Sequence, residues 1–248
     1  MAVLGVCFVA GGATCARRQT IAEFAPPRIF ETPPTLEELA TQINHSLAVQ
    51  RIESNTLSIS SPDVVGRLSG SLAWERPHNF QLQAYMGTKA FGIFKAGSNS
   101  EMFWLQRQVP SPTLFYAKHD EFESQLGPRT MLPVSPLWLR EALGVVEIDP
   151  ALHHNGPNAR PDGKLEIETF IPSPRGPYRR VLVLDAQYST IEQTLLYNQV
   201  GKLVAIAQQS EHQYYSAIDW SLPHKVDVQL QPDDGPPWAF SVAVEFYR

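Results

Sequence analysis

The chain has 248 residues, of which 43% are hydrophobic and 18% are charged. Its 21 prolines outnumber its 15 glycines, and this composition is typical of a folded, β-rich protein rather than a disordered, collagenous or coiled-coil one. The formal net charge of -5 provides no global positive field, so we expect no nucleic-acid partner.

The first residues resemble an export signal. Residues 2–13 are uncharged and mostly apolar, and the basic pair Arg17 and Arg18 follows shortly after them. A run of this length suits the core of a signal peptide and is too short to span a bilayer, which takes about 20 residues. We therefore predict a signal peptide over residues 1–15.

Cys15, at the end of this signal, is the candidate site of lipid attachment. The only other cysteine is Cys7, so the rest of the chain can form neither a disulfide framework nor a thiolate metal site. The small residues Gly12, Ala13 and Thr14 before Cys15 resemble the end of a bacterial lipoprotein signal, in which the cysteine is acylated. An ordinary cleaved signal and a non-exported apolar N-terminus are the alternative interpretations.

Residues 16–34 are predicted to form a tether. The stretch from Thr20 to Pro34 contains four prolines and shows no periodicity, as expected of a linker. We expect a single folded domain over residues 35–248.

Two helices are predicted in this domain. The first begins at Thr35, because Thr35 and Glu38 fit a Thr-x-x-Glu capping box and apolar residues follow at helical spacing. The second runs from Ser135 to Leu143, with Ser135 as its N-cap and Gly144 at its C-terminal end.

Almost every other segment alternates between apolar and polar residues with a period of two, which is typical of strands with one buried face. About ten or eleven strands can be counted, and a sheet of that size must curl. We predict a mainly β fold, an incomplete antiparallel β-barrel with two or so helices covering its concave face. Because two helices are few for so many strands, that face either keeps a partly open apolar cavity or is filled by the chain's own side chains.

No residue is predicted to be catalytic or to bind a metal. The sequence contains no common hydrolase, nucleotide-binding or zinc-protease motif, and we expect no cofactor. His153 and His154 are adjacent, but they lie in a stretch rich in Pro, Gly and Asn between Asp149 and Gly163. We predict a loop there rather than a metal site.

Two spaced motifs carry a resemblance to a known family. Residues 70–80 follow a Gly-x-Leu-x-x-x-Arg-Pro-x-x-Phe pattern, and residues 98–104 read Ser-Asn-Ser-Glu-Met-Phe-Trp. Together with the helix before them, these motifs resemble the LolA/LolB-like lipoprotein carrier family over the stretch from Leu36 to Phe122. The resemblance implies an incomplete barrel closed by helices over a hydrophobic cavity that holds acyl chains, in a monomeric protein without enzymatic activity.

The resemblance also implies site residues. Arg76 occupies the place of an arginine that, in the carrier, holds the lid helices by hydrogen bonding to their loop backbone; the alternative is a surface arginine that ends a strand. For Phe80 and Trp104 we favour packing in the core over direct contact with the ligand. The residues expected to line the cavity or its lid are Leu72, Trp74, Arg76, Phe80, Leu82, Trp104, Leu137 and Trp138.

The sequence thus predicts a membrane-anchored bacterial lipoprotein that faces the periplasm from the outer membrane. Its partners would be the membrane and either a lipid or an acylated protein. It would bind the acyl chains of that partner and could serve in the sorting of outer-membrane lipoproteins. Two alternatives stay open: an anchored structural or interaction protein with a filled half-barrel, and a hydrolase with an unrecognised site.

Overall fold

The computed structural model describes residues 24–62, 64–87, 92–107, 112–122, 134–173, 176–232 and 237–248. The predicted signal peptide, with Cys15, lies outside these residues. Within the described ranges, no helix is both long enough and apolar enough to cross a membrane.

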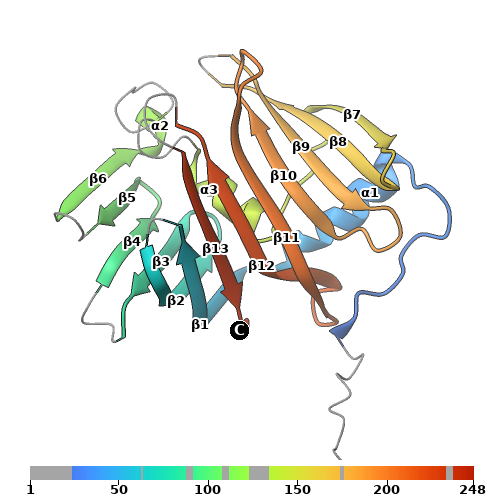
Figure 1. The fold of residues 1–248 in the computed structure, drawn as a ribbon. Coiled ribbons are helices and arrows are strands. Elements are labelled where there is room, and N and C mark those ends of the chain that lie inside the picture. Colours follow the sequence, from blue (N-terminus) through green and yellow to red (C-terminus); the bar gives the residue numbers. More distant parts are fainter. Residues whose placement is uncertain are drawn as a thin grey trace, which may run out of the picture.

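The strands of the described residues form one antiparallel sheet of thirteen (Figure 1). Their order is β6-β5-β4-β3-β2-β1-β13-β12-β11-β10-β9-β8-β7. Strands that follow each other in the chain are therefore neighbours, except that β13 pairs with β1 and that β6 and β7 are the two free edges. The sheet is not closed into a barrel, so the predicted fold class is confirmed, with more strands than the sequence indicated.

The strands and helices have the following bounds. The strands are β1 Arg51–Ser61, β2 Val64–Glu75, β3 Asn79–Tyr85, β4 Gly92–Ser98, β5 Met102–Arg107, β6 Thr113–Lys118, β7 His153–Ala159, β8 Lys164–Ile171, β9 Tyr178–Asp185, β10 Ile191–Tyr197, β11 Leu203–Tyr215, β12 Trp220–Leu230 and β13 Trp238–Val244. The helices are α1 Leu36–Ile43, the 3₁₀ helix η2 Asn44–Ala48, α2 His119–Phe122 and α3 Pro136–Ala142.

The sheet curls around its helices. Strand twist accumulates across a sheet of this size, and Figure 1 shows the strands curving around α1 and α3. We call the face that packs against α1, α3 and residues 143–149 the inner face, and the opposite one the outer face. Trp74 of β2 and Leu182 of β9 lie on the inner face, in one buried cluster with Leu39 of α1 and Val146.

Helix α1 fills part of the inner face. Its predicted capping box is present: the Glu38 amide donates to Thr35 Oγ1 at 3.3 Å, and the Thr35 amide donates to Glu38 Oε2 at 2.7 Å. This box fixes where the helix begins and so which of its faces is turned inward. Leu39 and Ile43 on that face are fully buried.

The chain after α3 is held against the helical segment η2. Asn44 Nδ2 donates to the Ile148 carbonyl at 3.1 Å, and the Ile148 amide donates to Asn44 Oδ1 at 2.9 Å. Ser46 Oγ also donates to the Val146 carbonyl. The Val146 and Ile148 backbone groups named here thereby have partners although these two residues are buried in the core.

Helix α3 confirms the second predicted helix, whereas the loop predicted around His153 and His154 is wrong. Both histidines lie in the edge strand β7, which pairs with β8 on both sides of an irregularity between Asn155 and Asn158. This irregularity contains Gly156 at φ +112°, a conformation that suits glycine. Pairing with β8 outweighs the turn-forming composition, because an edge strand tolerates glycine and proline at a bulge.

Residues 24–34, which we call the strap, lie on the domain. The amides of Ile29 and Phe30 both donate to the Gln187 carbonyl, at 2.8 and 3.1 Å. Phe30 packs against the main core and Pro34 is buried. The strap is the C-terminal part of the segment expected to be a tether, and it reaches the turn between β9 and β10.

Replacing Asn44 with alanine should lower the free energy of unfolding by about 1–3 kcal/mol, because the amide and carbonyl of Ile148 lose their partner. Equilibrium denaturation in urea measures this change. The exposed Asn55 serves as control, since Asn55→Ala should cost less than about 0.5 kcal/mol. Equal losses for the two variants would show that the pair with Ile148 does not hold this segment.

Candidate functional site

Helix α3 covers an apolar cluster of its own on the inner face. Its side chains Trp138 and Ala142 are buried, as is Val134 just before the helix. They pack on the strands β10 to β13, separately from the larger cluster around α1. The sheet residues of this cluster, which we call the α3 cluster, are Leu196, Val204, Ala205, Ala207, Val226, Val228 and Leu230.

The middle of the α3 cluster is made of small side chains. Ala205 and Ala207 of β11 are fully buried, and α3 packs on this strand. The neighbours of Ala207 across the sheet are Thr194 and Val228. Because an alanine adds only one methyl group to the sheet surface, the space above β11 is occupied by α3 rather than by the sheet itself.

A buried ion pair fastens the end of α3 to the sheet. Arg180 of β9 points to the inner face, and its Nη1 lies 2.7 Å from Glu141 Oε1, with 4% and 12% of the two side chains exposed. Arg180 Nη2 also donates to the Glu147 carbonyl at 2.9 Å and to Thr169 Oγ1 at 3.3 Å. One guanidinium thus holds the last turn of α3 and the chain that follows it.

Two more side chains of the inner face hold the same segment. Gln209 Nε2 donates to Thr194 Oγ1 at 3.0 Å and to the Glu141 carbonyl at 3.3 Å. His154 Nε2 lies 2.8 Å from the Asp149 carbonyl, and its Nδ1 lies 3.0 Å from Thr169 Oγ1. Sequence analysis considered His154 only as a loop residue and did not single out Gln209 or Arg180, since only the strand register shows that these residues share one face.

Arg76 lies at the end of β2, beside the helical segment. Its Nε donates to the Val49 carbonyl at 3.0 Å, and its guanidinium carbon lies 5.5 Å from the centre of the Trp74 ring. Burial lowers the pKa of Arg76, and so does the positive charge of Arg140 on α3, whereas Glu147 acts in the opposite direction. Arg76 therefore contacts the backbone just after η2 and interacts electrostatically with Arg140 on α3 and with Glu147 after it.

The sequence-derived lining residues fall into three groups. Leu72, Trp74 and Phe80 are buried in the larger cluster and Leu82 packs against it. Trp138 is buried in the α3 cluster. The side chain of Leu137 and the whole of Cys15 lie outside the described part of the chain.

Trp104 lies on the outer face. It is paired with Gly97 of β4, which is paired with Gln81 of β3, whereas Phe80 is paired with Trp74. Directly opposite residues of neighbouring strands share one face of a sheet, and successive residues alternate. Trp104 is thus on the side away from Trp74 and Phe80, where its ring lies over Gly97, and it does not face the space below α3.

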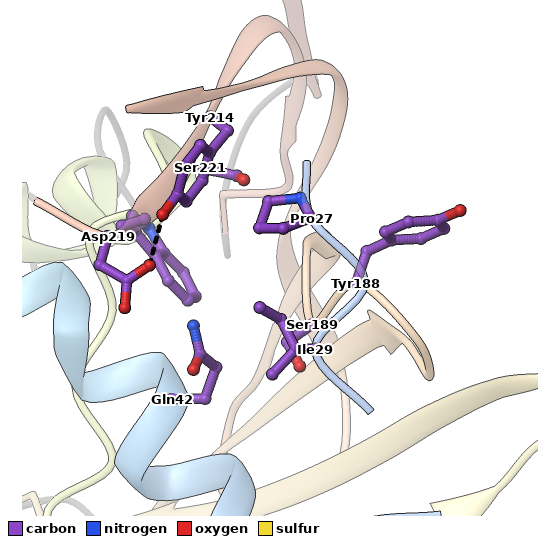
Figure 2. Close-up of a pocket in the computed structure, with 9 residues that line it drawn as sticks. Pro27, Ile29, Gln42, Tyr188, Ser189, Tyr214, Asp219 and Ser221 are labelled. Carbon is purple, nitrogen blue, oxygen red and sulfur yellow. Dashed lines mark hydrogen bonds between the residues drawn. The ribbon is translucent and has the colours of Figure 1, made fainter. Parts of the chain in front are cut away.

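A small pocket lies elsewhere, between the strap, α1 and two turns of the sheet (Figure 2). At its rim Tyr214 Oη donates to Asp219 Oδ1 at 2.6 Å. The pocket has room for about one water molecule, so it is too small for an acyl chain. Its lining residues are Pro27, Ile29, Gln42, Tyr188, Ser189, Tyr214, Asp219, Trp220 and Ser221.

No protein-family model and no curated protein matches the chain. Solved structures do match it. A domain from Vibrio parahaemolyticus described as an outer membrane lipoprotein-sorting protein superposes with a TM-score of 0.52 and 10% identity, covering 85% of this chain and 90% of that one. A LolA superfamily protein from Nitrosomonas europaea gives 0.52 and 10%, covering 87% and 93%. A DUF1329 family protein from Desulfovibrio piger gives 0.51 and 12%, covering 85% and 90%.

The chain has a LolA-like fold. The matches extend over most of both chains, so they include the curled sheet and its helical cover rather than one motif. The LolA-like fold that the two sequence motifs implied is therefore confirmed. At this level of identity the likeness is one of fold, and the roles of single residues have to be argued from this chain's own contacts.

Removing one partner of the buried ion pair should be costly. Glu141→Gln should lower the free energy of unfolding by about 3 kcal/mol, because Arg180 is left as an uncompensated buried charge. Replacing the pair together, Arg180→Met with Glu141→Gln, should restore most of the loss. Urea denaturation measures both variants.

The matched control is Glu168 of β8, which pairs with Arg179 on the outer face of β9, the strand that carries Arg180. Because this second pair is more exposed, Glu168→Gln should cost less than about 1 kcal/mol. A loss as large as that of Glu141→Gln would contradict the special position of the inner pair.

Proposed function

We propose that this protein is a membrane-anchored lipoprotein of the bacterial cell envelope that binds the acyl chains of a lipid or of another lipoprotein. Binding rather than catalysis is its role, and it acts as a monomer facing the periplasm from the outer membrane. The observation that carries this proposal is the separate apolar cluster on an open LolA-like sheet, which among the described residues is covered by the short helix α3 and by Val134 just before it.

Helix α3 is the part of the cover that a guest can replace. With seven residues it is too short to be a stable helix by itself, so it depends on the surface it covers. An acyl chain laid over Ala205 and Ala207 would bury the same apolar surface. About ten methylene groups at roughly 0.8 kcal/mol each give some 8 kcal/mol before ordering costs, which is enough to compete with α3 and still permits release.

Arg76 fits the role of holding the helical cover in place. Its Nε bond to the Val49 carbonyl connects the end of β2 to the backbone that follows α1 and η2. The alternative, a surface arginine that merely ends a strand, does not require such a bond. We propose that Arg76 restrains this helical segment while α3 moves.

A second candidate is an anchored structural or interaction protein with no cargo. It is favoured by the larger cluster, where Leu39, Ile43 and Val146 are completely buried by the chain's own side chains. The two candidates differ in whether the apolar surface below α3 binds an acyl chain or stays covered by the helix.

Bound lipid distinguishes these candidates. The full-length protein, purified from bacterial membranes and extracted with organic solvent, should release acyl lipid in about one molar equivalent by mass spectrometry. Ala207→Leu places a larger side chain on the inner face below α3 and should reduce this amount several-fold. Ile206→Leu, a change on the opposite face of the same strand, should not. Extracts free of acyl lipid in all three proteins would favour the structural role.

The membrane anchor is tested by metabolic labelling with a radioactive fatty acid. The full-length chain should incorporate label, and Cys15→Ala should lose it, because the thiol that carries the acyl group is gone. Equal labelling of both would end the lipoprotein proposal, whereas an unlabelled wild-type chain would favour an ordinary signal peptide or none.

A further inference from the structure

Arg180 places a positive charge in the middle of the apolar inner face. Across the sheet its direct neighbours are Thr169 on β8 and Leu196 on β10, and the same row continues to Ala205 on β11. Arg180 is only 3% exposed. A guanidinium does not lose its charge by burial, so an anion has to stay beside it.

In the structure that anion belongs to the cover. Glu141 is the last residue but one of α3, and its carboxylate is the acidic group bonded to Arg180. If a hydrocarbon guest takes the place of α3, Glu141 is withdrawn together with the helix. A neutral guest would then leave Arg180 buried and unpaired, which is strongly unfavourable.

The buried polar atoms around α3 are also incompletely bonded. Among the described residues, Arg180 Nε and Trp138 Nε1 have no acceptor, although both atoms are buried. Gln209 Oε1, next to Glu141, has no donor within these residues. Arg180 therefore has one donor to spare, its Nε–H, for an oxygen of a carboxylate or a phosphate.

We infer that the ligand is an amphiphile with an anionic head group, which replaces Glu141 at Arg180 while its hydrocarbon chain covers Ala205 and Ala207. This inference rests on the proposed function and names the class of ligand. The head group is a carboxylate, as in a free fatty acid, or a phosphate, as in a phospholipid. The exchange keeps Arg180 paired in both states, so the helix and the ligand compete for one charge as well as one apolar surface.

The neighbouring Arg179 provides a matched comparison. It lies on the outer face, where it pairs with Glu168 and its guanidinium carbon is 4.2 Å from the centre of the Tyr197 ring. Its side chain is 34% exposed, so water can solvate its charge. Arg179 has the same chemistry on the same strand and no part in the α3 cluster.

The test compares three probes with equal chains: dodecanoate, dodecyl phosphate and the neutral dodecanol. The two anions are titrated below their micelle concentrations and dodecanol below its solubility limit, at pH 8, into the delipidated full-length protein, and the dissociation constant is measured by calorimetry. The wild type should bind the better of the two anions at least about tenfold more tightly than dodecanol, a difference of roughly 1.4 kcal/mol. The tighter of the two anions identifies the head group. The chain's net charge of -5 disfavours anions, so such a preference has to be local.

Variants locate the preference. Arg180→Met with Glu141→Gln removes the inner pair as a unit and should bind all three probes with similar affinity. Arg179→Met with Glu168→Gln should keep the wild-type preference. If the first variant fails to fold, Arg180→Lys takes its place. This variant retains the charge and should show a weaker preference for anions than the wild type.

Each outcome is decisive. Equal affinity of the wild type for dodecanol and both anions overturns this inference but supports an acyl-binding protein. A preference for anions that survives in the inner-pair variant overturns it as well. If that variant does not fold, the inference is overturned when the preference is unchanged by Arg180→Lys and lost in the Arg179 control. Binding of none of the three probes overturns the proposed function and this inference together.

Discussion

A sheet with one apolar face has to cover that face, and this requirement governs the whole molecule. The thirteen strands leave two free edges, β6 and β7, so the sheet does not close on itself. Helix α1 and residues 143–149 cover one region with side chains that are almost completely buried, such as Ile43 and Ile148. Over β11, where the small side chain of Ala207 leaves space above the sheet, the short helix α3 covers the inner face. The same requirement is thus met by a densely packed filling in one region and, in the function that we propose, by an exchangeable one in the other.

The polar groups under α3 explain how a short helix keeps its place without being permanently fixed. Arg180, Gln209 and His154 hold the end of α3 and the chain after it, while the helix itself packs by Trp138 and Ala142. Fastening at one end leaves the apolar contacts of the rest free to be exchanged. A buried ion pair adds little net stability compared with apolar packing, but it makes the site selective for whatever can replace its carboxylate.

Local signals in the sequence were sufficient for much of the fold and not for the site. The capping box of Thr35 and Glu38 and the period of the strands depend on neighbouring residues. The box predicted α1 correctly, and the period predicted most of the strands but not β7. The inner position of Arg180 could not be predicted, because Arg179 and Arg180 are adjacent and only the register of β9 decides which one faces the core. Trp104 shows the same difficulty: it stands in a run of four apolar residues, Met102 to Leu105, so the sequence does not define which of them point inward. The pairing of β13 with β1 joins the two ends of the domain and leaves no local trace.

The central claim is that α3 gives up its place to an acyl chain, and amide hydrogen exchange tests it most directly. The exchange of residues 136–142 would be compared in the delipidated protein and in the protein saturated with a twelve-carbon amphiphile. Our account predicts that these amides exchange faster when the amphiphile is bound, while those of β9 to β11 are unchanged or slower. Slower exchange in α3 on binding, or no change at all, would contradict it.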